Sequence, residues 1–226
     1  MAGKAQRKSY EQYCPVARTL DMVGERWTLL IVRDLLMGPK RYTDLRGGLP
    51  GIASDILTAR LRTLQEAGFI RRRELPRPAP ATVYELTDEG RELRHVVLAL
   101  GRIGIVTLGE PRRGEDVQAE RIIVGLRPSF HHERFGTLTE AYELTIDGMP
   151  FTVEVSEGSV DTRPGTASDP ELRLRTDSGT LIRLLTGKLS PSGALALGDG
   201  QMEIEGERET LEHFTEAFAL SRGPSD

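Results

Sequence analysis

Cysteine and long apolar runs are scarce in this sequence. Cys14 is the single cysteine among 226 residues, so no disulfide can form within the chain, and a reducing compartment is expected. No apolar run has the length that a membrane helix requires, and the opening residues MAGKAQRKSY lack the apolar region of a signal peptide. We therefore expect a cytoplasmic protein with no membrane partner.

The sequence also lacks the common signatures of catalysis and of tightly bound cofactors. It contains no G-x-S-x-G, Walker or G-x-G-x-x-G pattern. Among the four histidines, only the pair His131-His132 beside Glu133 suggests metal ligands. Adjacent side chains point apart on a regular element, and no second ligand cluster accompanies the pair. The prediction is therefore that the protein is not an enzyme and has no catalytic residue, cofactor or metal site.

Charge is distributed unevenly along the chain, although the net charge is only −4. Residues 1–110 hold 18 Lys and Arg against 13 Asp and Glu, whereas residues 111–226 hold 12 against 21. A basic first half and an acidic second half indicate that only the first half contacts a polyanion such as nucleic acid.

The boundary between two domains is predicted at the segment GEPRRGED, residues 109–116. This segment is rich in glycine, proline and charge and poor in apolar residues, which is typical of a linker. We expect a first domain over residues 1–108, a linker over 109–117 and a second domain over 118–226. Each domain is long enough to bury a core of its own.

The first half shows helical periodicity before and after a pair of short strand-like runs. The expected order is four helices, a two-stranded hairpin and a last helix capped by Thr87, which is the order of a winged helix-turn-helix domain. In that fold the helix over residues 54–67 is the recognition helix. The helices are expected over residues 15–23, 25–37, 42–46, 54–67 and 88–108, and the strands over 69–75 and 82–87.

The same region resembles the HxlR family of winged-helix regulators over residues 14–107. The resemblance rests on the Cys-Pro start, G-x-x-W-T-L-L-I, the P-G-I before the recognition helix, L-T-x-R-L and the final Y-x-L-T-x-x-G. It implies a homodimer, formed by the first and last helices of the domain, on a roughly palindromic double-stranded DNA operator. Ala53 departs from the serine usual in the family, and Ser54 is expected to cap the recognition helix instead.

The DNA-contacting residues are expected on and around the recognition helix. The N-terminal half of such a helix reaches base edges, and the surrounding basic residues contact phosphates. Ser54, Asp55 and Thr58 are assigned to bases, and Arg77 at the wing tip to the minor groove. Arg71, Arg72 and Arg73 alternate faces of a strand, so they cannot all face DNA. The complete predicted set is Arg41, Tyr42, Ser54, Asp55, Thr58, Arg60, Arg62, Arg71, Arg73 and Arg77.

The second half mixes strands with helices. Tyr142, Leu144 and Ile146 alternate with polar residues, and turns at Asp147-Gly148 and Glu157-Gly158 predict a β-meander. Further strands are expected over residues 171–176 and 201–206, and helices over 118–130, 178–187 and 209–220. The whole chain is therefore predicted to be α+β, with an N-terminal winged helix-turn-helix domain and a C-terminal α+β domain.

This second half resembles the sterol carrier protein type of lipid-binding domain over residues 118–220. The resemblance implies a mostly antiparallel sheet under helices and a lipophilic small-molecule effector. The same apolar residues are equally expected in a dry, close-packed core. The candidate lining residues are Phe151, Val153, Ile182, Leu185, Leu195, Leu197, Phe214 and Phe218.

The function predicted from these features is a homodimeric transcription regulator, a repressor, with a C-terminal domain that binds an apolar effector. One alternative is a thiol switch at Cys14 with a purely structural C-terminal domain, because some HxlR-type regulators sense oxidants through a cysteine at this position. Another alternative is a lipid carrier whose winged helix serves dimerisation only.

Overall fold

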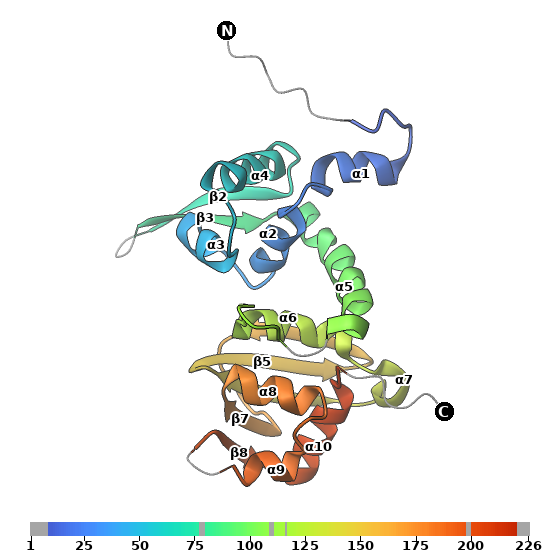
Figure 1. The fold of residues 1–226 in the computed structure, drawn as a ribbon, viewed down its shortest axis with the longest axis vertical. Coiled ribbons are helices and arrows are strands. Elements are labelled where there is room, and N and C mark those ends of the chain that lie inside the picture. The colour runs from blue at the N-terminus through green and yellow to red at the C-terminus, as the bar shows by residue number, and fades with distance from the viewer. Residues whose placement is uncertain (1–8, 77–79, 109–110, 116, 198–199, 221–226) are drawn as a thin grey trace. The chain divides into compact units, whose positions relative to one another are not determined.

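The chain folds into two compact units in the computed structural model, which describes residues 9–76, 80–108, 111–115, 117–197 and 200–220. The N-terminal unit is Met1–Val97 and the C-terminal unit is Leu98–Asp226. The helix α5 (Asp88–Leu108) begins in the first unit and ends in the second (Figure 1). The domain limits drawn at residues 108 and 118 stay predictions. Among the described residues, no helix is both long and apolar enough to cross a membrane.

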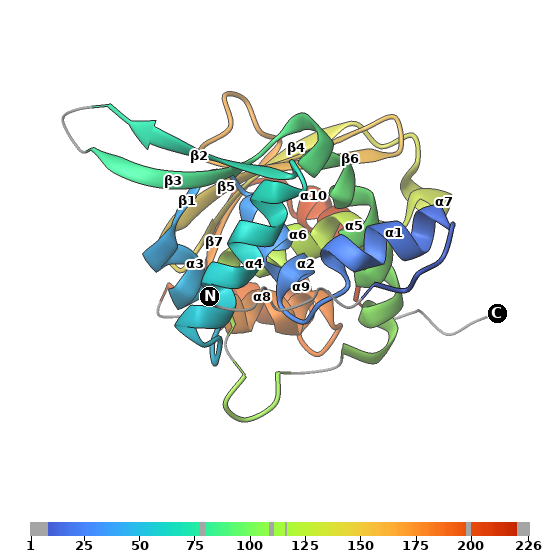
Figure 2. The same cartoon turned by 90° about the horizontal axis from the view of Figure 1, so that it is seen from above.

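The N-terminal unit has the element order of a winged helix, which confirms the predicted fold class. Its three strands are antiparallel in the order β1-β3-β2, and the β2–β3 hairpin projects beyond the helices of the unit (Figure 2). The strand β1 was not predicted, because two residues carry no alternating pattern. The elements before α5 are α1 (Pro15–Val23), α2 (Thr28–Leu35), β1 (Lys40–Arg41), α3 (Tyr42–Gly48), α4 (Ser54–Glu66), β2 (Ile70–Leu75) and β3 (Ala81–Leu86).

The second helix begins three residues later than the sequence pattern predicts. Trp27 precedes α2 with φ 79°, a left-handed conformation that bulky residues rarely adopt. The Trp27 side chain packs against the hydrophobic core of the unit, and the Arg26 guanidinium lies 5.0 Å from the centre of its ring. Tertiary packing, rather than helical propensity, therefore sets the turn between α1 and α2.

The recognition helix α4 begins at Ser54, but Ser54 does not cap it, so that prediction was wrong. Ala53 is the N-cap residue, and no side chain accepts a hydrogen bond at that position. Ser54 is instead the first helical residue, and its carbonyl oxygen accepts a hydrogen bond from the Thr58 hydroxyl at 2.8 Å. Asp55 places a carboxylate in the first turn, where the helix dipole favours negative charge.

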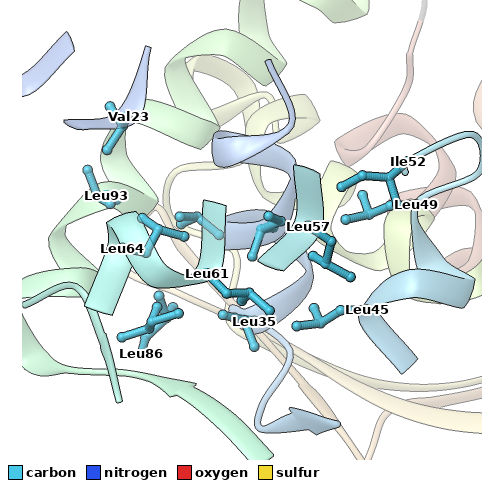
Figure 3. Packing of buried hydrophobic residues seen from close by; sticks show 13 residues of the cluster. Val23, Leu35, Leu45, Leu49, Ile52, Leu57, Leu61, Leu64, Leu86 and Leu93 are labelled. Carbon is cyan, nitrogen blue, oxygen red and sulfur yellow. The ribbon is translucent and has the colours of Figure 1, made fainter. Parts of the chain in front are cut away.

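The inner face of α4 forms the centre of the hydrophobic core of the N-terminal unit (Figure 3). Leu57, Leu61 and Leu64 follow the i, i+4, i+7 spacing of one helix face and are fully or almost fully buried. They pack with Ile31 and Leu35 of α2, among others. Burial of this face leaves the opposite, polar face of α4 exposed.

The C-terminal unit has a five-stranded sheet in the order β6-β5-β4-β7-β8. Among the described strands of this sheet, only β4 and β7 pair in parallel, which confirms the mostly antiparallel sheet. The short helices α7 and α9 were not predicted. The elements after α5 are α6 (Ala119–Ser129), α7 (His132–Phe135), β4 (Glu140–Ile146), β5 (Met149–Ser156), β6 (Ser159–Pro164), β7 (Leu172–Thr176), α8 (Ser178–Leu185), α9 (Pro191–Leu195), β8 (Met202–Gly206) and α10 (Arg208–Ala217).

One face of this sheet is apolar and packs against helices (Figure 1). Tyr142 of β4 contacts the rings of Phe214 and Phe218 at centroid distances of 5.1 and 6.3 Å, and Phe130 lies 5.4 Å from Phe218. The Tyr142 hydroxyl donates a hydrogen bond of 2.6 Å to Glu140. Burial of this phenol, followed by the hydrogen bond to Glu140, raises the pKa of Tyr142 well above its usual value.

The central position of Leu57 gives a stability prediction. Replacing Leu57 with Ala should lower the free energy of unfolding by about 2–5 kcal/mol, because removal of the buried side chain leaves a cavity. Unfolding in guanidinium chloride would be followed by the fluorescence of Trp27, the single tryptophan, which packs on this core. Leu75→Ala, at the end of β2 and outside the core cluster, is the control. Equal effects of the two substitutions would contradict the prediction.

Candidate nucleic-acid interface

The start of α3 and the first turns of α4 meet in a polar junction. The Tyr42 hydroxyl donates a hydrogen bond of 3.0 Å to the Ser54 carbonyl oxygen and lies 3.5 Å from the Thr58 hydroxyl oxygen. Asp44 accepts a hydrogen bond of 2.9 Å from the backbone N–H of Arg41 at the start of α3. The structure thus brings together three residues that the sequence assigned to DNA: Tyr42, Ser54 and Thr58.

The strand register places three of the predicted arginines on one face of the N-terminal sheet. Val83 of β3 pairs with Arg41 of β1 on one side and with Arg73 of β2 on the other. Arg71 lies two residues before Arg73 on the same strand, and residues two apart project to the same face. We call this surface the arginine face: Arg41, Arg71, Arg73, Val83 and Glu85. Its three arginines are exposed.

Glu85 joins two of these arginines and was missed by the sequence reasoning. Its two carboxylate oxygens accept one hydrogen bond each, from Arg71 Nε at 2.7 Å and from Arg73 Nε at 2.8 Å. The Glu85 side chain is only 11% exposed. The hydrogen bond from Arg71, followed by that from Arg73, holds the pKa of Glu85 below its usual value. The pairing of Glu85 with Arg71 depends on the hairpin register, which the sequence pattern did not specify.

The other face of the hairpin carries Arg72 and is organised differently. The Arg72 guanidinium lies 5.9 Å from the centre of the Tyr84 ring, and Glu74 accepts a hydrogen bond of 2.6 Å from the Thr82 hydroxyl. The alternation expected for the three consecutive arginines is therefore confirmed.

Two arginines of α4 occupy different environments. The Arg62 side chain is 78% exposed and pairs with Glu66 on the same helix at 2.8 Å. The Arg60 side chain is 19% exposed and directed toward Glu25, 3.3 Å away. Its Nε atom is buried without a hydrogen-bond partner in the structure as described. Arg60 is thus largely covered and paired with Glu25, which is itself 59% exposed. The position expected for Arg60, at the DNA backbone or a groove edge, stays a prediction.

Two further predicted residues have simpler outcomes. Asp55 is exposed on the first turn of α4. Arg77 lies outside the described residues, so its position at the wing tip stays a prediction.

The candidate effector-lining residues of the C-terminal unit lie in varied environments. Phe151, Val153, Leu185, Phe214 and Phe218 are buried in the core of the unit. Ile182 and Leu197 are half-buried, and Leu195 is 37% exposed. The structure brings Phe214 and Phe218 together, with ring centroids 5.1 Å apart. Their contact with an effector stays a prediction.

The histidine pair and the other acidic and thiol groups form no metal site among the described residues. Within that part of the chain, no three His, Cys, Asp or Glu side chains gather in an arrangement that could hold a metal ion. His131 Nε2 lies 3.0 Å from the carbonyl oxygen of Ala219, and His132 is exposed at the start of α7.

Comparison with known families agrees with this architecture in both halves. Residues 22–110 match the model described as HxlR-like helix-turn-helix. The chain belongs to the HxlR-like helix-turn-helix family. Residues 127–219 match the SCP-2 sterol transfer family. The chain is therefore an HxlR-like winged helix joined to an SCP-2-type domain, as the resemblances implied.

Individual relatives of the HxlR-like part are named as transcriptional regulators. The HTH-type transcriptional regulator sll1512 of Synechocystis sp. is 36% identical over 40% of this chain and 67% of its own length. YybR, an HTH-type transcriptional regulator of Bacillus subtilis, is 34% identical over 40% of this chain and 73% of its own. A solved structure of the redox regulator HypR in its reduced form has 33% sequence identity and a TM-score of 0.38, and the match covers 40% of this chain and 90% of that one.

The contrast between Arg60 and Arg62 yields a prediction. Arg62→Ala should change the free energy of unfolding by less than about 0.5 kcal/mol, because the side chain is largely exposed. Arg60→Ala should lower it by about 1–2 kcal/mol through lost packing of the buried stem and the lost Glu25 pair. Of the two, only Arg62→Ala should make the slope of log affinity against log salt concentration shallower, by the amount that corresponds to about one phosphate contact. The reverse assignment of the two effects would show that Arg60 is the exposed residue.

Proposed function

We propose that this chain is a sequence-specific DNA-binding regulator that acts as a homodimer, as a repressor, and that its C-terminal unit binds an apolar effector. The observation that supports DNA binding most directly is the arrangement of three exposed arginines, Arg41, Arg71 and Arg73, on one face of the sheet. Arg41 directly precedes Tyr42, which is hydrogen-bonded to the start of α4. Arg41 is thereby placed next to a helix whose outer face is polar.

In this proposal α4 enters the major groove of double-stranded DNA. An α-helix fits that groove, and Ser54, Asp55 and Thr58 lie in its first two turns, where side chains reach base edges. Arg41, Tyr42 and Arg62 contact phosphates beside the groove. The wing supplies Arg71 and Arg73, with Arg77 reaching the minor groove at its tip. Phosphate contacts fix the register of the protein on the duplex, and base contacts give the sequence preference.

Exposed apolar side chains on α1 and α5 support a dimer. Val96, Leu100 and Ile103 of α5 are 40%, 50% and 72% exposed, and their i, i+4, i+7 spacing places them on one side of the helix. On α1, Val16 and Leu20 are likewise exposed. Apolar stripes of this kind mark protein–protein contacts. A two-fold dimer would present two α4 helices to half-sites about one DNA turn apart, ~34 Å.

The SCP-2 match supports an apolar effector as the regulatory ligand. The proposed lining set is the one predicted from the sequence, with Phe214 and Phe218 at its centre. Regulation requires that the effector binds the DNA-competent and the DNA-incompetent dimers with different affinity. Release of the operator on effector binding is the behaviour of a repressor whose ligand induces transcription.

The thiol switch remains the alternative within the same class. Cys14 is half-exposed at the N-cap of α1, so reagents in solution reach it, and one thiol from each protomer suffices for an intersubunit bond. In that alternative Cys14→Ser abolishes the response of DNA binding to oxidants. A lipid carrier that uses its winged helix only for dimerisation would leave the arginine face without a partner.

The first experiment is fluorescence anisotropy with the DNA upstream of the chain's own coding sequence and with a scrambled duplex, across a salt series. A specific regulator should bind the upstream duplex at least ~10³-fold more tightly, with affinity that falls steeply with salt. Equal, weak binding would move the search to genomic fragments selected by the protein with and without lipid extract. If neither condition selects a fragment, the carrier is the better explanation.

The dimer is tested on the α5 stripe. Ile103→Glu should convert a particle of twice the 25.0 kDa chain mass into one of the chain mass, because a charge in an apolar interface is desolvated without a partner. Sedimentation velocity measures both states. Arg102→Glu, on the next residue and off the stripe, is the matched control and should stay dimeric. A wild-type protein that sediments as a monomer at micromolar concentration would refute the dimer.

A further inference from the structure

We propose that Glu85 is a positioning residue for DNA binding. It holds the guanidinium groups of Arg71 and Arg73 in a fixed orientation on the arginine face, so that these side chains are already ordered before they contact phosphates. The inference rests on the proposed DNA-binding function. It adds a residue that makes no DNA contact itself.

The geometry of the three side chains carries the argument. Each Glu85 oxygen receives the Nε atom of a different arginine, at 2.7 and 2.8 Å. Within the described part of the chain, no other group accepts a hydrogen bond from either arginine. The Nη1 and Nη2 ends of both guanidiniums are therefore left as donors, while the two side chains are 66% and 44% exposed. A planar guanidinium held along its Nε edge still presents its outer edge to a phosphate.

The position of Glu85 on the central strand β3 distinguishes this arrangement from a pair of two freely exposed side chains. Its side chain is 11% exposed and lies opposite Arg71 in the strand ladder, so the backbone fixes where the carboxylate stands. An exposed partner would itself be mobile and would order nothing. The hydrogen bond from Arg71, followed by that from Arg73, lowers the pKa of Glu85.

Two effects of Glu85 on DNA binding oppose each other. Its negative charge weakens the attraction of the wing to any phosphate backbone, because it offsets part of the charge of two arginines. Its hydrogen bonds already order the two long arginine side chains in the free protein. Less conformational entropy is therefore lost on binding, which strengthens binding where the geometry fits. The proposal is that the second effect dominates on the specific site. The first effect alone governs non-specific DNA.

The test compares Glu85→Gln with Glu74→Gln in the full-length protein. Glu74 is on the opposite face of the same hairpin, so the control removes the same charge without touching the arginine pair. The probes are the duplex that the wild-type protein selects from genomic fragments and a scrambled duplex of the same composition. Glu85→Gln should weaken the selected duplex about tenfold and leave the scrambled duplex unchanged or slightly tighter. Glu74→Gln should shift both duplexes together, by about twofold or less.

Two additional variants separate position from charge and from folding. Glu85→Asp keeps the charge but shortens the side chain, so it should also weaken the selected duplex, whereas a purely electrostatic effect predicts no change. In an Arg71→Gln/Arg73→Gln background, Glu85→Gln should have no further effect on affinity. Thermal unfolding followed by Trp27 fluorescence confirms that each variant is folded.

The outcomes are distinct. If the wild-type protein prefers its selected duplex but Glu85→Gln behaves like Glu74→Gln, Glu85 does not position the arginines and only this inference fails. If Glu85→Gln tightens both duplexes equally, Glu85 acts through its charge, which also overturns it. If the wild-type protein selects no duplex, the proposed function fails and the inference fails with it.

Discussion

The packing of one side of α4 into the core of the N-terminal unit determines most of what this unit can do. Leu57, Leu61 and Leu64 are buried, and a helix with one face fixed in a close-packed interior cannot rotate about its axis. The polar side is therefore the outer side at every position. Ser54, Asp55, Thr58 and Arg62 are exposed as a consequence. Arg60, beside this buried face, is largely covered and pairs with Glu25.

The positive charges of the arginine face are brought together by strand register, not by one helix. β1 and β2 flank β3, so residues far apart in sequence, Arg41 and Arg73, lie on either side of Val83. Three cations on one small surface repel one another. Glu85 offsets part of that repulsion, because its carboxylate accepts hydrogen bonds from two of the three arginines. Three arginines from the basic first half of the chain are thus held on one face of the sheet.

The C-terminal unit is organised around a cluster of buried aromatic side chains. Its sheet has one apolar face, and the rings of Tyr142, Phe214, Phe218 and Phe130 meet there in edge and tilted contacts. Tyr142 keeps its hydroxyl bonded to Glu140 within this apolar setting. Such an interior is built from the residues that an apolar ligand would also contact, which explains why burial alone does not distinguish a core from a lined pocket.

The sequence by itself determined most of the elements, the α+β class and the position of the recognition helix, but it missed β1, α7 and α9. These predictions depend on local periodicity and turn residues, and a single chain displays these directly. The mostly antiparallel second sheet was implied by the resemblance to the sterol carrier protein type of domain. The sequence also assigned Tyr42, Ser54 and Thr58 to one surface, and the structure brings them together; their contact with DNA stays a prediction. Only the tertiary structure decided that Trp27, between α1 and α2, adopts a left-handed conformation. It also decided that α4 has Ala53 as its N-cap residue, without a side-chain cap, and that Arg60 pairs with Glu25. It alone joined Arg71 and Arg73 through Glu85. These features depend on packing and strand register between distant segments, which no local pattern encodes.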